Sequence, residues 1–559
     1  MSMSAIRLTA LSVGTLLAAG GFASAQPSYP GAPYAPPSSY VPPSPVTSYG
    51  QGQGLSQSDV QGLSMVLAAA RTGGSTRIRS AMDGLYDPLA RRIALWALAD
   101  VAPDSLGEQE TAIMANLPVG WPRADRHQIA AQREQLVEQL DDEFETGWTA
   151  LTRFNNPSVA DEHFVRLQQM SQAPLTQSRA LYWRGRVADA MGDGLAAQLF
   201  YSQAAEYPTT FYGQLAAAKT ANPVISLGHD PLITASDRAQ FEGLEAVRAT
   251  RLLAQIGAKD TFETFVVALS EGLPTATQEA LLVDLAADLG SQTLAMRVVR
   301  NAARRGFILP DRGYPLRTTP SGYSAPETAF VLGIVRQESS FDPMAHSGAG
   351  ARGIMQLMPA TAQSVANHLG LGYGDLYDAS YNMTVGSAFL GQLVGQFDGS
   401  YVMAAAAYNA GPGRPPQWAA TCGDPRSSSV DPVNFIECIP FDETRNYVMR
   451  VLEATQVYRA RLHGGTAPIT LADDLKRGGY GHVGGYVAST PMPTSTVAAS
   501  TPYSHPVGSS ASPAVMAPIP DPIGSERAAA SDTPYSRSTS PAASPTTMAP
   551  IPDPVSPEP

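Results

Sequence analysis

The chain has 559 residues, which is too many for a single domain. Its formal net charge of −12 argues against general nucleic-acid binding, because such proteins present a basic face to the phosphate backbone. The same charge argues against simple electrostatic adhesion to any anionic surface. We therefore expect recognition to depend on a shaped site, and we take the chain in order to find one.

The first 25 residues have the three regions of a secretory signal peptide. Arg7 supplies a positive charge, residues 8–19 form a short apolar core, and residues 23–25 read Ala-Ser-Ala. The apolar run is too short to span a bilayer, and no cysteine follows it for lipid attachment. We expect cleavage after Ala25, export to the periplasm and no membrane anchor.

Residues 26–54 are rich in Pro, Gly, Ser and Tyr and are predicted to form a linker. Residues 55–303 alternate apolar stripes with short breaks, which is typical of paired helices. Helices of this length need neighbours to bury their faces, so we expect an all-α chain that begins with an α-solenoid or superhelix. The clearest helical segments are residues 85–102, 126–154, 177–191 and 195–206. Such an array could equally be a scaffold for a protein partner, and residues 304–325 connect it to the C-terminal half of the chain.

A helix predicted over Glu327–Ser339 carries one acid on its apolar face. Its apolar stripe consists of Phe330, Val331, Ile334 and Val335. Glu338 follows at helical spacing and projects from the same stripe, where desolvation would raise its pKa. The alternative is a helix-end glutamate that turns out to solvent or pairs with Arg336 or Arg352.

Further motifs follow this helix within one domain-sized window. In order, they are Arg336–Ser339, Ser347 in His-Ser-Gly-Ala-Gly-Ala, Gly353–Pro359, Ala407–Gly413 and Ile439–Tyr447. A helix predicted over Tyr401–Tyr408 should stop at Asn409. Taken singly, these segments have ordinary explanations: Met355 and Met358 could fill a core, and Gln356 could lie on the surface.

Together and in this order, the motifs make residues 326–462 resemble the catalytic domain of the soluble lytic transglycosylases, a lysozyme-like family that cleaves peptidoglycan. The resemblance implies a lysozyme-like, mainly helical domain, to which we assign residues 326–465, and Glu338 as its single catalytic acid. It also implies that the substrate is bound by Ser347, Gln356, Met358, Tyr408, Asn409 and Glu443. No metal and no cofactor is expected.

The resemblance further implies cleavage of the β-1,4 bond between N-acetylmuramic acid and N-acetylglucosamine without water, which leaves a 1,6-anhydro end. Most glycosidases use two carboxylates. Near Glu338 the other candidate acids are in turns or polar loops: Asp342, Asp375, Asp378 and Asp398. A hydrolytic muramidase and a non-catalytic periplasmic scaffold remain the alternatives.

Two cysteines occur, Cys422 and Cys438, both between the Tyr408 and Glu443 motifs. In an oxidising compartment a pair this close is a disulfide candidate, and two buried thiols are the alternative.

Residues 466–559 are predicted to form a low-complexity, disordered tail. It contains a tandem repeat offset by 32 residues: the Thr-Pro-Tyr-Ser of residues 501–504 returns at 533–536, and the Pro-Ile-Pro-Asp-Pro of 518–522 returns at 550–554. The tail could be a spacer or a docking segment for a protein partner.

Overall fold

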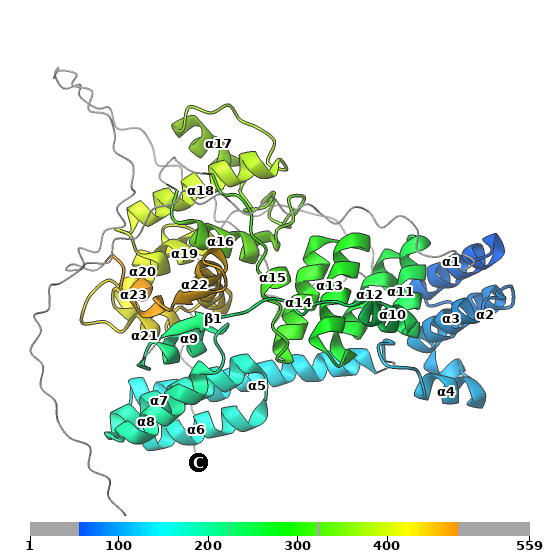
Figure 1. Cartoon of the computed structure of the whole chain (residues 1–559), viewed down its shortest axis with the longest axis horizontal. Helices are drawn as coiled ribbons and strands as arrows, with labels where there is room; N and C mark the ends of the chain where they lie inside the picture. Colours follow the sequence, from blue (N-terminus) through cyan, green and yellow to red (C-terminus); the bar gives the residue numbers. More distant parts are fainter. Residues whose placement is uncertain (1–54, 124, 222, 321–324, 479–559) are drawn as a thin grey trace, which may run out of the picture. The chain divides into compact units, whose positions relative to one another are not determined.

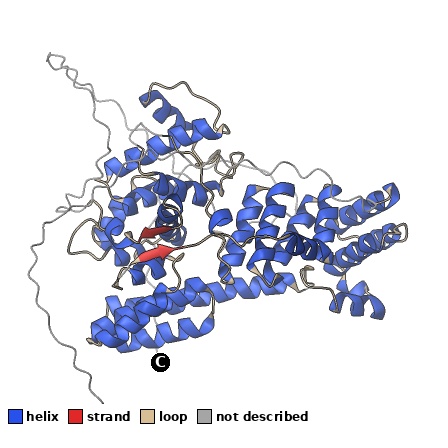
Figure 2. Ribbon diagram, in the orientation of Figure 1, coloured by secondary structure: helices blue, strands red, loops and turns tan. Residues whose placement is uncertain are grey.

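The computed structural model describes residues 55–123, 125–221, 223–320 and 325–478. The regular secondary structure of this part of the chain is helical apart from two short strands, which confirms the all-α prediction (Figure 2). From Ser56 onward it forms one compact unit. The predicted signal peptide, the linker up to residue 54 and both copies of the repeat lie outside the described residues.

Most consecutive helices of the N-terminal half pack against each other, as expected for a helical array (Figure 1). Their starts follow local chemistry: Asp87 accepts hydrogen bonds from Leu89 and Ala90 at the start of α3, and Pro88 occupies the first helical position. The array comprises α1 Gln57–Arg71, α2 Ser75–Met82, α3 Pro88–Val101, α4 Glu108–Ala115, α5 Arg126–Thr152, α6 Pro157–Met170, α7 Pro174–Met191, α8 Gly194–Ala205, α9 Phe211–Ala217, α10 Ala235–Gly243, α11 Glu245–Gln255, α12 Lys259–Gly272, α13 Ala276–Leu289 and α14 Gln292–Arg304.

The connector after α14 is attached to its surroundings by ion pairs. It contains the short helix α15, Pro310–Gly313. Arg312 forms salt bridges with Asp230 and Asp284, each at 2.7 Å, and Asp311 pairs with Arg461. These bonds link the connector both to the array and to the long C-terminal helix α22, Asp442–Leu462.

The C-terminal helices are built around one long helix, α22. They are α16 Thr328–Ser339, α17 Pro359–His368, α18 Ala379–Gln396, α19 Tyr401–Ala410, α20 Arg414–Cys422, α21 Pro432–Glu437, α22 Asp442–Leu462 and α23 Leu471–Leu475. Helix α16 packs along α22, and Gly333 permits the close approach, since a Cβ at this position would lie 3.0 Å from the carbonyl oxygen of Val451. Phe330 of α16 also stacks on Tyr401, with ring centroids 4.0 Å apart.

The structured region continues past residue 465, so the boundary predicted at residue 466 is wrong. Strand β2, Thr466–Pro468, pairs antiparallel with β1, Val224–Ser226, and helix α23 follows it. The apolar residues of this segment are buried: Ala467, Ile469, Leu471 and Leu475. The segment is too short to show a periodic pattern, and its partner strand lies far away in the sequence, so no local signal marks it.

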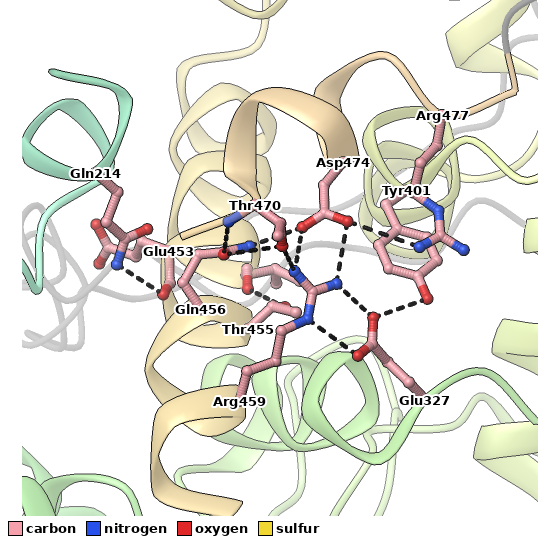
Figure 3. A network of polar contacts seen from close by, with 11 residues as sticks. Gln214, Glu327, Tyr401, Glu453, Thr455, Gln456, Arg459, Thr470, Asp474 and Arg477 are labelled. Carbon is pink, nitrogen blue, oxygen red and sulfur yellow. Dashed lines mark hydrogen bonds and ion pairs between the residues drawn. The ribbon is translucent and has the colours of Figure 1, made fainter. Parts of the chain in front are cut away.

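A polar network holds this C-terminal segment against α22 (Figure 3). Arg459 donates to Glu327, which lies just before α16, at 3.0 Å and also to Asp474 of α23 at 2.5 Å. Gln456 donates to Asp474 at 2.7 Å and accepts from the backbone N–H of Thr470 at 2.9 Å. One arginine therefore joins the end of the domain to the start of the helix that carries Glu338.

We expect a chain that ends at Gly465 to be less stable than one that ends at Gly478. The shorter chain loses burial of Ile469, Leu471 and Leu475, each worth about 1.5–3 kcal/mol. Its free energy of unfolding, measured with urea, should therefore be lower by about 4 kcal/mol or more. Equal unfolding midpoints and slopes for the two chains would show that this segment contributes nothing.

Candidate active site

Glu338 lies in the last turn of α16, buried among the apolar side chains that the sequence pattern indicated. It is only 7% exposed, and Ile334 and Val335 of the same stripe are fully buried. Burial raises the pKa of Glu338 from its ordinary value of 4.5 to about 8. The alternative in which this side chain turns out to solvent is therefore wrong, and the group is protonated at neutral pH.

The alternative in which Glu338 pairs with Arg336 or Arg352 is also wrong, because Glu338 forms a hydrogen bond with a tyrosine instead. The hydroxyl of Tyr447 on α22 donates to Oε1 of Glu338 at 2.5 Å. Arg336, two residues before Glu338, instead donates to the carbonyl of Gly313 at 2.9 Å and lies over the ring of Tyr314. The hydrogen bond from Tyr447 lowers the pKa of Glu338 less than burial raises it.

Tyr447 is the residue that the sequence reasoning missed. It closes the Ile439–Tyr447 motif, but only Glu443 of that motif was expected at the site. Glu443 lies four residues earlier on α22, so both residues project from one face of the helix. That i, i+4 spacing was the available signal. The structure places Glu443 close enough for its negative charge to raise the pKa of Glu338 further.

Tyr408 comes to the same site from α19. Its hydroxyl donates to the carbonyl of Met355 at 2.8 Å. Burial raises the pKa of Tyr408 well above 10, and the charge of Glu338 adds to this effect. Tyr408 is therefore a neutral, buried donor whose position links α19 to the loop before α17.

The sequence pattern predicted that helix α19 stops at Asn409, and this prediction is wrong. The helix runs to Ala410 and ends at Gly411, whose φ of +89° suits a residue without a Cβ. Asn409 lies within the helix, and its side-chain oxygen accepts a hydrogen bond from the hydroxyl of Thr444 at 2.6 Å. This bond joins α19 to the first turn of α22.

Gln356 lies in a tight loop rather than on the surface. Its backbone has φ +47°, and its amide donates to the carbonyls of Ala345 and Gly353 at 3.0 and 2.8 Å. The side-chain oxygen is buried and accepts no hydrogen bond from the described residues. Gly353 makes the loop possible, because a Cβ there would lie 2.0 Å from the carbonyl oxygen of Leu376.

The remaining expected site residues lie around this loop. Ser347 is partly exposed, and its hydroxyl accepts from the backbone N–H of Ala351 at 2.9 Å. Met358 is partly exposed and precedes α17. Hydrogen bonds join the two ends of the segment, with Arg352 bridging both His346 and Leu357. Ser347 and Met358 are thus brought near the Gln356 loop.

The acids considered as second carboxylates have structural partners. Asp342 accepts from the backbone of Met344, Asp375 from Tyr377, and Asp378 caps α18 through Tyr381. Asp398 pairs with Arg426 at 2.7 Å. Of these candidates and Glu443, only Glu443 acts electrostatically on Glu338.

Two further features bear on what the site can hold. Cys422, at the end of α20, and Cys438, after α21, are joined by a disulfide. Within the described ranges, no cluster of three or more His, Cys, Asp or Glu side chains is arranged to bind a metal ion. Among the same residues, no helix has the length and apolarity needed to cross a membrane. The site offers a neutral carboxylic acid, a buried tyrosine donor on that acid and polar groups on a nearby loop.

Part of this chain is similar to known proteins. Residues 322–429 match the family described as the transglycosylase SLT domain. The match contains Glu338, Gln356 and Tyr408, whereas Glu443 and Tyr447 follow it in the chain.

The curated relatives match over about a quarter of this chain. The soluble lytic murein transglycosylase of Escherichia coli strain K12 is 38% identical over 143 residues, which are 25% of this chain and 21% of that protein. The membrane-bound lytic murein transglycosylase D of the same strain is 31% identical over 147 residues, which are 26% of this chain and 31% of that protein. The chain therefore spans about a fifth to a third of the length of these two relatives.

Solved structures of similar proteins match a larger share at low similarity. The lytic transglycosylase Slt of Pseudomonas aeruginosa, solved as an inactive mutant, has a TM-score of 0.46 and 22% identity, with 74% of each chain covered. The 70 kDa soluble lytic transglycosylase of Escherichia coli has a TM-score of 0.43 and 21% identity, covering 75% of this chain and 65% of that one. Similarity at this level adds no argument beyond the SLT domain.

The burial of Glu338 should appear in the pH dependence of stability. Between pH 4.5 and about 8 the unfolded chain ionises this glutamate while the folded chain keeps it protonated. The unfolded state then binds fewer protons, so this group's contribution to stability falls as pH rises through that window. Glu338→Gln removes the effect. As pH rises through the window, the free energy of unfolding of the variant minus that of the parent should therefore increase by on the order of 1 kcal/mol per pH unit.

This measurement isolates Glu338 because Glu279, whose pKa burial also raises to about 8, is the same in both proteins. Denaturant unfolding at pH 5, 6.5 and 8 provides the comparison. A difference between variant and parent that does not change with pH would contradict the raised pKa.

Proposed function

We propose that this protein is a peptidoglycan lytic transglycosylase, an enzyme of the lyase class that cleaves glycan strands between N-acetylmuramic acid and N-acetylglucosamine. The observation that carries the proposal is the buried, protonated Glu338 with its Tyr447 partner inside an SLT domain. Curated relatives with the name soluble lytic murein transglycosylase support the same reaction and substrate.

In the proposed mechanism, Glu338 gives its proton to the oxygen of the scissile glycosidic bond. The acetamido oxygen of the substrate stabilises the positive anomeric carbon, in place of a protein nucleophile. The carboxylate of Glu338 then takes the proton from the C6 hydroxyl of the muramic residue, which attacks C1. No water is consumed, and the product carries a 1,6-anhydro ring.

The side chains around Glu338 have separate roles in this scheme. Tyr447 orients the carboxyl group and supplies a hydrogen bond to the carboxylate once the proton has left. Gln356 has a buried side-chain oxygen available to accept a hydrogen bond from the sugar. We assign further substrate contacts to Ser347, Met358, Tyr408, Asn409 and Glu443.

A hydrolytic muramidase is the second candidate, because Glu443 acts electrostatically on Glu338. A second carboxylate could activate a water molecule or attack the anomeric carbon. Against this, the C6 hydroxyl is tethered to the reacting sugar and so has a high effective concentration. The intramolecular attack is therefore the proposed route.

We further propose that the enzyme acts in the periplasm, after removal of the predicted signal peptide at Ala25. A glycan strand is the proposed substrate, in agreement with the murein named for the relatives. A protein partner for the helical array or for the repeat tail remains part of the proposal.

Replacing the acid should abolish lysis while leaving the fold intact. Glu338→Gln keeps the shape but delivers no proton, so turbidity loss of purified sacculi should slow by ~10²–10⁴-fold. Tyr447→Phe is the matched variant, because it keeps the acid and removes only its donor. The pKa of Glu338 should then rise, and the basic limb of its pH–rate profile should move to higher pH. Activity of Glu338→Gln within a factor of two of the parent would rule out the assignment.

The products distinguish the two candidate reactions. Digestion of sacculi in ¹⁸O-labelled water should release muropeptides with 1,6-anhydro ends and no label in the sugar, as measured by mass spectrometry. A muramidase would instead give reducing ends that are heavier by one water and carry the label. Labelled reducing ends as the major product would replace the proposed reaction by hydrolysis.

A further inference from the structure

A large cavity lies apart from the candidate active site. Its volume is about 620 Å³, which is within the usual range for pockets that hold small molecules. It is lined by residues of α5 and α7, of α14 and the connector, and of α16 and α22. Glu338 is not among its lining residues, although Arg336 and Gln337 of the same helix are.

Arginine dominates the polar lining of this cavity. Seven arginines and three acids line it, in a chain whose net charge is −12. The arginines are Arg133, Arg179, Arg300, Arg304, Arg305, Arg336 and Arg450, and the acids are Asp141, Glu271 and Glu453. The overall composition of an acidic chain does not account for a cluster of arginines around one cavity.

Several of these arginines are held in place by neighbouring groups. Arg179 bonds to Asp141 at 3.1 Å and to the buried Glu437 at 3.3 Å, and its guanidinium lies 3.3 Å from the centre of the Phe144 ring. Arg450 bonds to Glu453 at 3.0 Å. Fixed guanidinium groups lose little side-chain entropy when they bind an anion.

Arg336 differs from these in its partners. Its Nε donates to the carbonyl of Gly313, and its guanidinium lies 4.4 Å from the centre of the Tyr314 ring. Among the described residues no carboxylate pairs with Arg336. Its contacts orient a full positive charge at the cavity without neutralising it, which suits a bidentate anion.

Apolar side chains also form part of the wall. They include Leu136, Val137, Leu140, Leu167, Val299 and Ile308. A bare inorganic anion would leave this surface unused. The lining therefore favours a ligand with an anionic group and an apolar body.

We propose that this cavity binds a small organic anion, with a phosphate or carboxylate group held by arginines including Arg336 and with an apolar body against α5 and α14. The proposal is independent of the reaction assigned to the SLT domain. A ligand bound there also contacts α16 and α22, the two helices that carry Glu338 and Tyr447.

Isothermal titration calorimetry of the whole protein at constant ionic strength tests the proposal. The probes are phenyl phosphate, phthalate, inorganic phosphate and benzyl alcohol. At least one of the two aromatic anions should bind with one site per chain and at least ~10-fold more tightly than inorganic phosphate. Benzyl alcohol, which has the ring without the charge, should not bind. The stronger of the two aromatic anions identifies the preferred anionic group.

Variants then locate the binding site. Arg336→Gln and the double variant Arg300→Gln with Arg304→Gln should each weaken binding of the aromatic anion by ~10-fold or more. Arg248→Gln is the control, because Arg248 is exposed on α11 and does not line the cavity. Circular dichroism and the melting temperature without ligand establish that each variant is folded.

The proposal is overturned by either of two results. One is the absence of binding of both aromatic anions to the parent at millimolar concentration. The other is binding that the folded Arg300/Arg304 double variant retains at parental strength, which would place the anion elsewhere on the chain.

Discussion

The structure depends on the packing of α16 against α22, because this contact creates the apolar surroundings of Glu338. Gly333 lets the two helices approach closely, and the buried stripe of α16 desolvates the acid. The same contact places the hydroxyl of Tyr447 2.5 Å from the carboxyl group. One interface therefore sets both the protonation state of the acid and its orientation, and a change in helix spacing would alter the two together.

Helix α22 connects this interface to the rest of the domain. Its first turn holds Asn409 of α19 through Thr444, and Arg459 in its last turn joins Glu327 to Asp474. The network in Figure 3 links the segment after residue 465 to the start of α16. Parts of the chain that are distant in sequence thus reach the helix that carries Glu338 through one scaffold helix. Stability of the C-terminal segment and geometry of the site are consequently coupled.

Helices α16 and α22 also separate two environments of opposite character. On one side, burial and the nearby Glu443 keep a carboxyl group neutral. The other side is a cavity rich in arginine, to which α16 contributes Arg336 and Gln337. Successive residues of a helix point about 100° apart, so neighbouring positions can face different environments. This geometry lets a charged side chain and a neutral acid lie two residues apart.

The sequence by itself determined the helical class, the helix that carries Glu338 and the burial of that residue, because helical periodicity is a local pattern that fixes which residues share a face. It also indicated the segments of Gln356 and Tyr408. Only the tertiary structure decided that Tyr447 is the partner of Glu338, that α19 continues through Asn409, and that residues 466–475 belong to the domain. These features depend on hydrogen bonds and strand pairing between segments far apart in the chain, which leave no periodic signal in either segment.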